Sequence, residues 1–112
     1  MKLPNAENAC VPPAKILVYL LSIDNPRGRD KAEFSLKFGF VPEQWQQFAE
    51  ALRVHGSRHE VVNVRDTLHG PTFAVDGILE APDGRNPDVR TVCIIRHNST
   101  RPALVTAYPS GD

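Results

Sequence analysis

Arginine and hydroxyl-bearing side chains occur within the last two apolar segments of the chain: Arg90, Thr91, Arg96, Thr106 and Tyr108. A guanidinium group is a planar fork of donors that matches phosphate oxygens, and Thr or Tyr hydroxyls can hydrogen-bond the same phosphate or a ribose hydroxyl. On one shared surface these side chains would form a phosphodiester site. Otherwise the arginines extend from strand edges into solvent, and Thr and Tyr are simply residues that favour strands.

The pairing of these two segments decides whether the polar side chains meet. Side chains alternate along a strand, so Arg90 shares a face with Arg96, and Leu104 shares one with Thr106 and Tyr108. A hairpin with Arg96 opposite Leu104 gathers the polar set on one face, and a one-residue shift separates it. The polar pattern favours the first register. That register leaves four residues for the core: Cys93, Ile95, Val105 and Ala107.

Four β-rich segments predict the sheet that must position these residues. They are EVVNVRD (60–66), TFAVDGIL (72–79), DVRTVCIIR (88–96) and ALVTAY (103–108). Turn-forming stretches separate them, namely LHGP, APDGRNP and HNSTRP. Because these connections have the length of hairpin loops, they predict antiparallel pairing.

Three helical segments are predicted before the strands, over residues 13–25, 29–38 and 42–56. Pro13 and Pro42 suit the first turn of a helix, where a missing N–H costs nothing. Gly39 and Gly56 suit the residue that ends one. Helices followed by strands predict a single α+β domain over residues 1–112. Its helical half is about 13–56 and its sheet half about 59–109, with the helices on one face of a four-stranded antiparallel sheet.

Composition is consistent with one globular domain, since 112 residues with 41% apolar content can bury an ordinary core. Thirteen basic residues balance thirteen acidic ones, so total charge indicates neither nucleic acid nor membrane. Residues 85–109, however, contain four arginines and a single acid, Asp88. A neutral protein with this distribution can still present one basic face to a phosphate-bearing ligand.

Cysteine content and apolar runs predict the compartment. Cys10 and Cys93 do not form a dense cysteine framework, which indicates two reduced thiols. No apolar run approaches the roughly 18 residues of a membrane span. Residues 1–15 also lack the apolar region of a signal peptide. We therefore expect a cytoplasmic protein that does not contact a membrane.

Histidine spacing offers two further candidates. His55 and His59 are four residues apart, but Gly56 is predicted to end the helix between them, and no carboxylate or cysteine completes a ligand set. No metal site is therefore predicted. His97 lies in the predicted hairpin loop beside Arg96 and could supply an acid or a base. No glycine-rich nucleotide loop or serine-nucleophile motif occurs, so no cofactor is predicted.

The sequence resembles a family of small bacterial proteins along nearly its whole length. The shared motifs are LPNAENA (3–9), YLL (19–21), G-x-x-KA-x-F…GF (28–40), VDGIL (75–79), PDGR (82–85), VRTVCIIR (89–96) and LVTAYP (104–109). The helix-then-strand order and the closing VTAYP are also similar to the barnase–EndoU–colicin–RelE superfamily of small RNases and toxins. EndoU-like members end in a Thr/Ser-x-Tyr-Pro strand, a pattern that Thr106 and Tyr108 match.

The resemblance implies metal-independent RNA cleavage through attack of the 2′-hydroxyl, by a toxin with a small antitoxin or immunity protein as partner. It implies that Thr106 and Tyr108 line the active site. Together with the polar pattern it leads us to expect four catalytic residues, Lys31, Arg90, Thr106 and Tyr108. Three further residues are expected to bind the RNA: Arg96, Arg29 and His97. Related toxin domains often carry a histidine as general base in the second-helix region, where this chain has Arg29, Asp30 and Lys31.

A second hypothesis is a non-catalytic interaction module of the same fold that binds a protein partner. Catalysis requires Arg90, Thr106 and Tyr108 within reach of one phosphate, whereas pairing of Arg90 with Asp76 or Asp88 would favour the interaction module. A third hypothesis is an antitoxin or immunity protein with an apolar helical interface around two residues of the third helix: Trp45 and Phe48. The sequence leaves open the RNA substrate, the partner and the oligomeric state.

Overall fold

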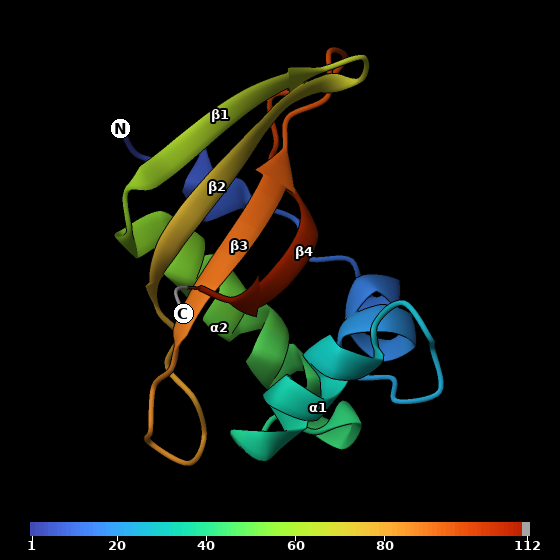
Figure 1. Ribbon diagram of the computed structural model, residues 1–112. Coiled ribbons are helices and arrows are strands. Elements are labelled where there is room, and N and C mark those ends of the chain that lie inside the picture. The colour runs from blue at the N-terminus through green and yellow to red at the C-terminus, as the bar shows by residue number, and fades with distance from the viewer. Residues whose placement is uncertain (111–112) are drawn as a thin grey trace.

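Four antiparallel strands form one sheet, in the order in which they occur in the chain (Figure 1). The computed structural model describes residues 1–110. Its strands are β1 (Val61–Thr67), β2 (Gly70–Ile78), β3 (Asp88–Ile94) and β4 (Ala103–Pro109). Each strand pairs with the next because the connections are short, so the predicted α+β fold with an antiparallel four-stranded sheet is confirmed.

Each predicted helical segment contains a helix. The helices are η1 (Ala6–Asn8), η2 (Lys15–Leu20), α1 (Arg29–Lys37), η3 (Pro42–Gln44) and α2 (Trp45–Arg58). The first predicted helix is shorter than expected, because η2 ends at Leu20. It is a π-helix, in which the Leu21 N–H donates to the Ile16 carbonyl at 2.8 Å. Gly56 does not end the third helix, because α2 continues to Arg58. No helix within residues 1–110 has the length and apolar character needed to cross a membrane.

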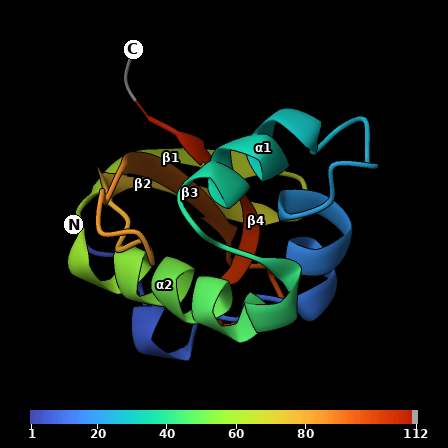
Figure 2. The ribbon, with the colours of Figure 1, turned by 90° about the horizontal axis from the view of Figure 1, so that it is seen from below.

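The helix α2 covers one face of the sheet, while η2 and α1 lie around the β4 edge (Figure 2). Phe48 of α2 is buried in the core and stacks on Phe40, with 4.4 Å between ring centroids. Trp45 is half-buried and packs against the same core. Phe48 is therefore not available to the apolar helical interface of the third hypothesis, whereas Trp45 keeps part of its surface exposed. Cys10 and Cys93 are both free thiols.

A β-bulge in β4 corrects the predicted hairpin register. Arg90 lies opposite Tyr108 and Val92 opposite Thr106, but the register then shifts so that Cys93 lies opposite Leu104. The extra residue lets Leu104 enter the core while Thr106 and Tyr108 face the opposite side of the sheet. The predicted pairing of Arg96 with Leu104 is therefore wrong. The predicted common face for Arg90, Thr106 and Tyr108 is correct.

Candidate functional site

A chain of polar contacts connects Lys31, Tyr19 and Thr106 where α1 and η2 meet β4. The Lys31 Nζ donates a hydrogen bond to the Tyr19 hydroxyl at 2.5 Å, and this hydroxyl lies 3.5 Å from Thr106 Oγ1. The same Nζ lies 6.0 Å from the ring centroid of Tyr108. All four side chains are half-buried and therefore accessible to a ligand. The structure thus brings together three of the four predicted catalytic residues and adds Tyr19.

The environment of Tyr19 makes its hydroxyl more acidic than an ordinary phenol. Burial by itself raises the pKa of Tyr19, but the hydrogen bonds with Lys31 and Thr106 act in the opposite direction. The positive charges of Lys31 and Lys15 lower the pKa further, and the net effect is a pKa below the usual value of 10. A phenol with a lowered pKa beside an ammonium group is suited to proton transfer.

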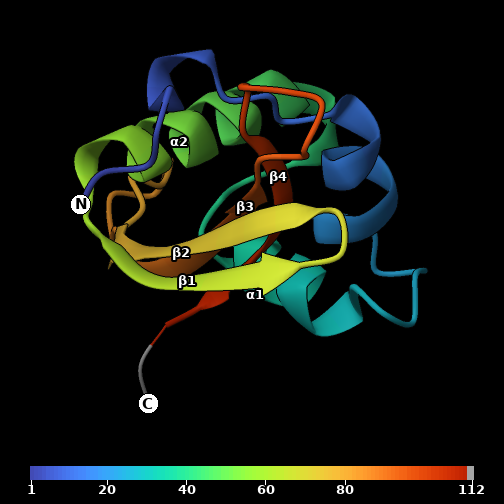
Figure 3. The ribbon, with the colours of Figure 1, turned by 90° about the horizontal axis from the view of Figure 1, so that it is seen from above.

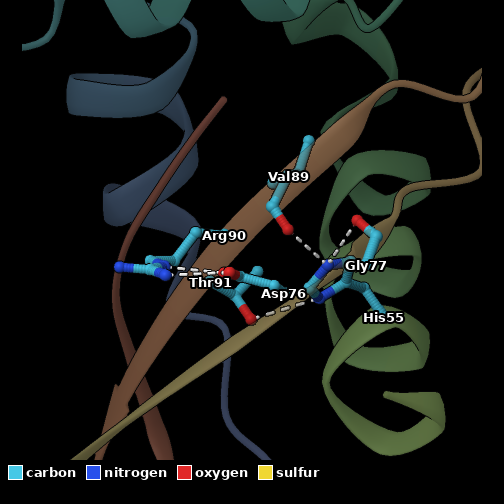
Figure 4. A network of polar contacts seen from close by, with 6 residues as sticks. All are labelled: His55, Asp76, Gly77, Val89, Arg90 and Thr91. Carbon is cyan, nitrogen blue, oxygen red and sulfur yellow. Dashed lines mark hydrogen bonds and ion pairs between the residues drawn. The ribbon is translucent and has the colours of Figure 1, made fainter. Parts of the chain in front are cut away.

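Arg90, the fourth predicted catalytic residue, lies beside Tyr108 but is held by Asp76. Its Nε donates to Asp76 Oδ1 at 2.6 Å, and its Nη2 donates to Oδ2 at 2.8 Å (Figure 4). Asp76 and Arg90 are cross-strand partners on β2 and β3, which aligns the two side chains. The pKa of Arg90 is raised, mainly by its hydrogen bonds to Asp76 and to a smaller extent by Tyr108. The same hydrogen bonds lower the pKa of Asp76.

The three predicted RNA-binding residues lie outside the polar cluster, by which we mean Lys31, Tyr19, Thr106 and Tyr108. Arg29 begins α1, and its Nε donates to the Ile23 carbonyl at 3.0 Å, which holds the loop before the helix. Arg96 and His97 lie in the β3–β4 loop, at the opposite end of β3 from Arg90. There the His97 N–H donates to the His69 carbonyl at 3.2 Å. Because β3 ends at Ile94, Arg96 lies outside the strand that carries Arg90.

The motifs that the sequence shares with a family extend over the fold just described. A family model matches residues 2–111, and its description is "Domain of unknown function (DUF6883)". The chain belongs to the DUF6883 family. No curated protein matches the sequence.

The DUF6883 chain shares its fold with a chain of a solved structure, the contact-dependent growth inhibition toxin–immunity protein complex from Klebsiella pneumoniae 342. The match covers 96% of this chain and 97% of that chain, with a TM-score of 0.72 and 13% sequence identity. At this identity the comparison shows a common fold, and the fold extends over both chains almost completely.

A second polar network in the DUF6883 chain lies in the core and was not predicted. The Nε2 of His55 donates to the carbonyls of Val89 at 2.8 Å and Gly77 at 3.1 Å (Figure 4). Since both partners are acceptors, Nε2 carries the proton, and Nδ1 accepts from the Thr91 hydroxyl at 3.2 Å. Burial lowers the pKa of His55, which keeps the ring neutral. The signal that could have revealed it is its spacing of i+7 from Phe48 and i+3 from Leu52, on the apolar side of α2.

His59 and a nearby cavity have no part in the polar cluster. His59 Nε2 donates to the Ile78 carbonyl at 3.0 Å, and within residues 1–110 no three His, Cys, Asp or Glu side chains are grouped to hold a metal ion. A cavity of about 560 Å³ lies between α2 and the residues that follow β2. None of the predicted site residues of the DUF6883 chain lines it.

Gly28 permits the close approach of η2 and α1 that brings Tyr19 to Lys31. A Cβ at residue 28 would lie 2.3 Å from the Tyr19 carbonyl oxygen. We expect Gly28→Ala to lower the free energy of unfolding by about 1–3 kcal/mol, because the backbones must separate. The measurement is urea unfolding. Gly56→Ala is the matched control, since its Cβ would meet Leu3 at 3.7 Å, an ordinary contact. Equal stability of the two variants would contradict this account of the DUF6883 chain.

Proposed function

We propose that this chain is a toxin-type RNase-like domain that cleaves RNA without a metal ion, through attack of a 2′-hydroxyl on the adjacent phosphate. The observation that carries the proposal is the contact chain from Lys31 through Tyr19 to Thr106, with Tyr108 beside it. Three separate elements contribute an ammonium group and hydroxyls to one accessible surface. The resemblance of the last strand to EndoU-like RNases, and the fold shared with a chain of a toxin–immunity complex, support the same function.

Each residue of the polar cluster has a role in this reaction. Tyr19, with its lowered pKa, accepts the 2′-hydroxyl proton as the 2′-oxygen forms a bond to phosphorus. Lys31 stabilises the negative charge on the phosphate and donates a proton to the 5′-oxygen as its bond to phosphorus breaks. Thr106 and Tyr108 orient the phosphate and the ribose. The products are a 2′,3′-cyclic phosphate and a 5′-hydroxyl.

The ion pair of Arg90 favours a second candidate function, a non-catalytic module that binds a protein partner. A guanidinium that already donates two hydrogen bonds to Asp76 is not free to clamp a phosphate with the same two groups. The stretch PRGRDKAEF (26–34) also contains no histidine that could act as general base. In this function the Arg90–Asp76 pair stabilises the sheet, and RNA is not cleaved.

The deciding experiment is incubation of the purified chain with total bacterial RNA in EDTA, together with expression in a bacterium. RNase function predicts growth arrest and fragments that end in 2′,3′-cyclic phosphate. Thr106→Val should slow cleavage about tenfold, the effect of losing about one hydrogen bond in the transition state. Thr100→Val, at an exposed loop residue, is the matched control and should cleave like the wild type. Intact RNA and healthy cells with the wild type would instead select the interaction module.

A further inference from the structure

The two edges of the sheet differ in how they are covered. Along β4, Cys10 pairs with the strand, since its N–H donates to the Pro102 carbonyl at 2.7 Å and its carbonyl accepts from the Leu104 N–H at 2.9 Å. The helices η2 and α1 contact the rest of this edge. Along β1, the Met1 carbonyl accepts the Val61 N–H at 2.7 Å, which covers only the start of the strand. Figure 3 shows β1 at the outside of the sheet.

The backbone groups that point away from the sheet at this edge belong to Val64 and Asp66. The Pro71 carbonyl accepts the Ile95 N–H at 3.1 Å, so the backbone of Pro71 faces β3. Backbone groups alternate in direction along an antiparallel strand, so Thr72 faces β1 and pairs with Arg65. Val64 and Asp66 therefore direct both N–H and C=O outward. Within residues 1–110 these groups have no backbone partner.

The side chains of β1 do not prevent a further strand from pairing with this edge. Val62 and Val64 are 52% and 47% exposed, and Leu68 at the following turn is 87% exposed. Proteins commonly protect an edge with Lys or Pro, and β1 contains neither. Arg65 and Asp66 carry opposite charges on opposite faces of the strand, and neither forms a salt bridge among the described residues. Open backbone groups, β-branched residues and unpaired charges together match the requirements of strand addition.

We propose that residues 62–67 of β1 bind an antiparallel strand of a different protein, which places an acidic side chain opposite Arg65 and a basic side chain opposite Asp66. A second copy of this chain does not supply these charges. In a two-fold antiparallel pair, outward-facing residues pair with outward-facing residues, so Arg65 never lies opposite Asp66 of the other copy. The surface is separate from the polar cluster on β4, and the inference holds whether or not the chain cleaves RNA.

The test uses a synthetic eight-residue peptide of alternating Thr and Val, with Glu placed opposite Arg65 and Lys placed opposite Asp66. Binding is followed by amide hydrogen exchange, measured by NMR. With roughly nine-tenths of the chain bound, the amides of Val64 and Asp66 should exchange about tenfold more slowly, since only the free fraction exchanges. A peptide with Glu and Lys interchanged should bind roughly tenfold more weakly. Val64→Pro removes an outward N–H and should abolish binding, whereas Val64→Thr should retain it.

A charge-reversed chain keeps the test decisive if Val64→Pro does not fold. The double variant Arg65→Glu/Asp66→Lys should prefer the interchanged peptide by the same factor. The proposal is overturned if neither peptide protects Val64 and Asp66, or if folded Val64→Pro binds like the wild type. It is also overturned if sedimentation shows a dimer in which these two amides are already protected, because the edge would then belong to a second copy.

Discussion

In the proposed RNase reaction, Lys31→Met is expected to slow RNA cleavage by about 10²–10⁴-fold, the usual contribution of a positioned proton donor or acceptor. The substitution removes the ammonium group that donates to the Tyr19 hydroxyl at 2.5 Å and keeps the length of the side chain. Because Lys31 is half-buried on α1 and outside the core cluster, the free energy of unfolding should change little. Initial rates on an RNA oligonucleotide, together with urea unfolding, measure both effects.

Lys15→Met is the matched control for this prediction. Lys15 Nζ also lies near the Tyr19 ring, 5.5 Å from its centroid, but Lys31 is the lysine that donates to the hydroxyl. Cleavage by the Lys15 variant should remain within roughly threefold of the wild type, as expected for a charge that acts on Tyr19 only through space and is partly screened by solvent. Equal losses in the two lysine variants would show that general positive charge, rather than the Lys31–Tyr19 contact, supports cleavage.

The pH dependence of cleavage follows from the same contact. If Tyr19 must be deprotonated to act as a base, the rate rises with pH until the pKa of Tyr19, which lies below 10. Removal of Lys31 takes away its hydrogen bond and its charge, both of which lower that pKa. The residual activity of Lys31→Met should therefore reach its plateau at a higher pH than that of the wild type. A plateau at an unchanged pH would remove Tyr19 from the mechanism.

His55→Ala should lower the free energy of unfolding by about 3–5 kcal/mol, a large part of the 5–15 kcal/mol typical of a domain. The substitution leaves a cavity beneath the sheet and deprives the Val89 carbonyl and the Thr91 hydroxyl of a buried partner. His59→Ala is the matched control, at the residue that directly follows α2. Its half-buried ring makes one hydrogen bond, to the Ile78 carbonyl, so the expected loss is about 0.5–1.5 kcal/mol. Urea unfolding at neutral pH measures both variants.

Acidification should destabilise the wild type through the same histidine. The pKa of His55 is lowered in the folded state, whereas in the unfolded chain it is about 6.5. Between these two values the unfolded state binds more protons, so the free energy of unfolding falls as pH falls below about 6.5. In the variant His55→Leu, the free energy of unfolding should lack this part of its dependence on pH. A wild type that becomes more stable on acidification in this range would show that folded His55 is charged.

Local sequence patterns predicted most of the fold because they reflect local physical requirements. The stretches LHGP, APDGRNP and HNSTRP mark the turns of the sheet, Pro13 lies just before η2, and Pro42 begins η3. The bulge in β4 was not predicted, since a bulge depends on how the strand packs between the core and β3. Gly56 was assigned to a helix end, but it lies inside α2, where a Cβ would make only an ordinary contact with Leu3. A single glycine is tolerated within a helix that packs well along one face, so the local signal for a helix end was wrong here.

The candidate site was predicted only in part, because some of its contacts form only when separate elements come together. Residue type and alternation placed Arg90, Thr106 and Tyr108 on one face, and the resemblance added Lys31. Tyr19 was placed within the first predicted helix but not assigned to the site, because its hydroxyl acquires partners only when η2, α1 and β4 come together. Arg96 was wrongly placed opposite Leu104 since strand alternation was extended past the end of β3.

The bulge in β4 gives this strand a position at which its length can change. Residues 103–109 supply Leu104 to the core and Thr106 to the opposite face because one extra residue, Val105, separates the two alternation patterns. Loss of the Val105 codon would restore regular alternation and leave both side chains on their present faces. Loss of a codon from β3, which pairs with β2 without an extra residue, would instead exchange the faces of the side chains on one side of the deletion. Evolutionary deletions should therefore be tolerated at residue 105 and among the exposed loop residues 96–101, and be absent from β3.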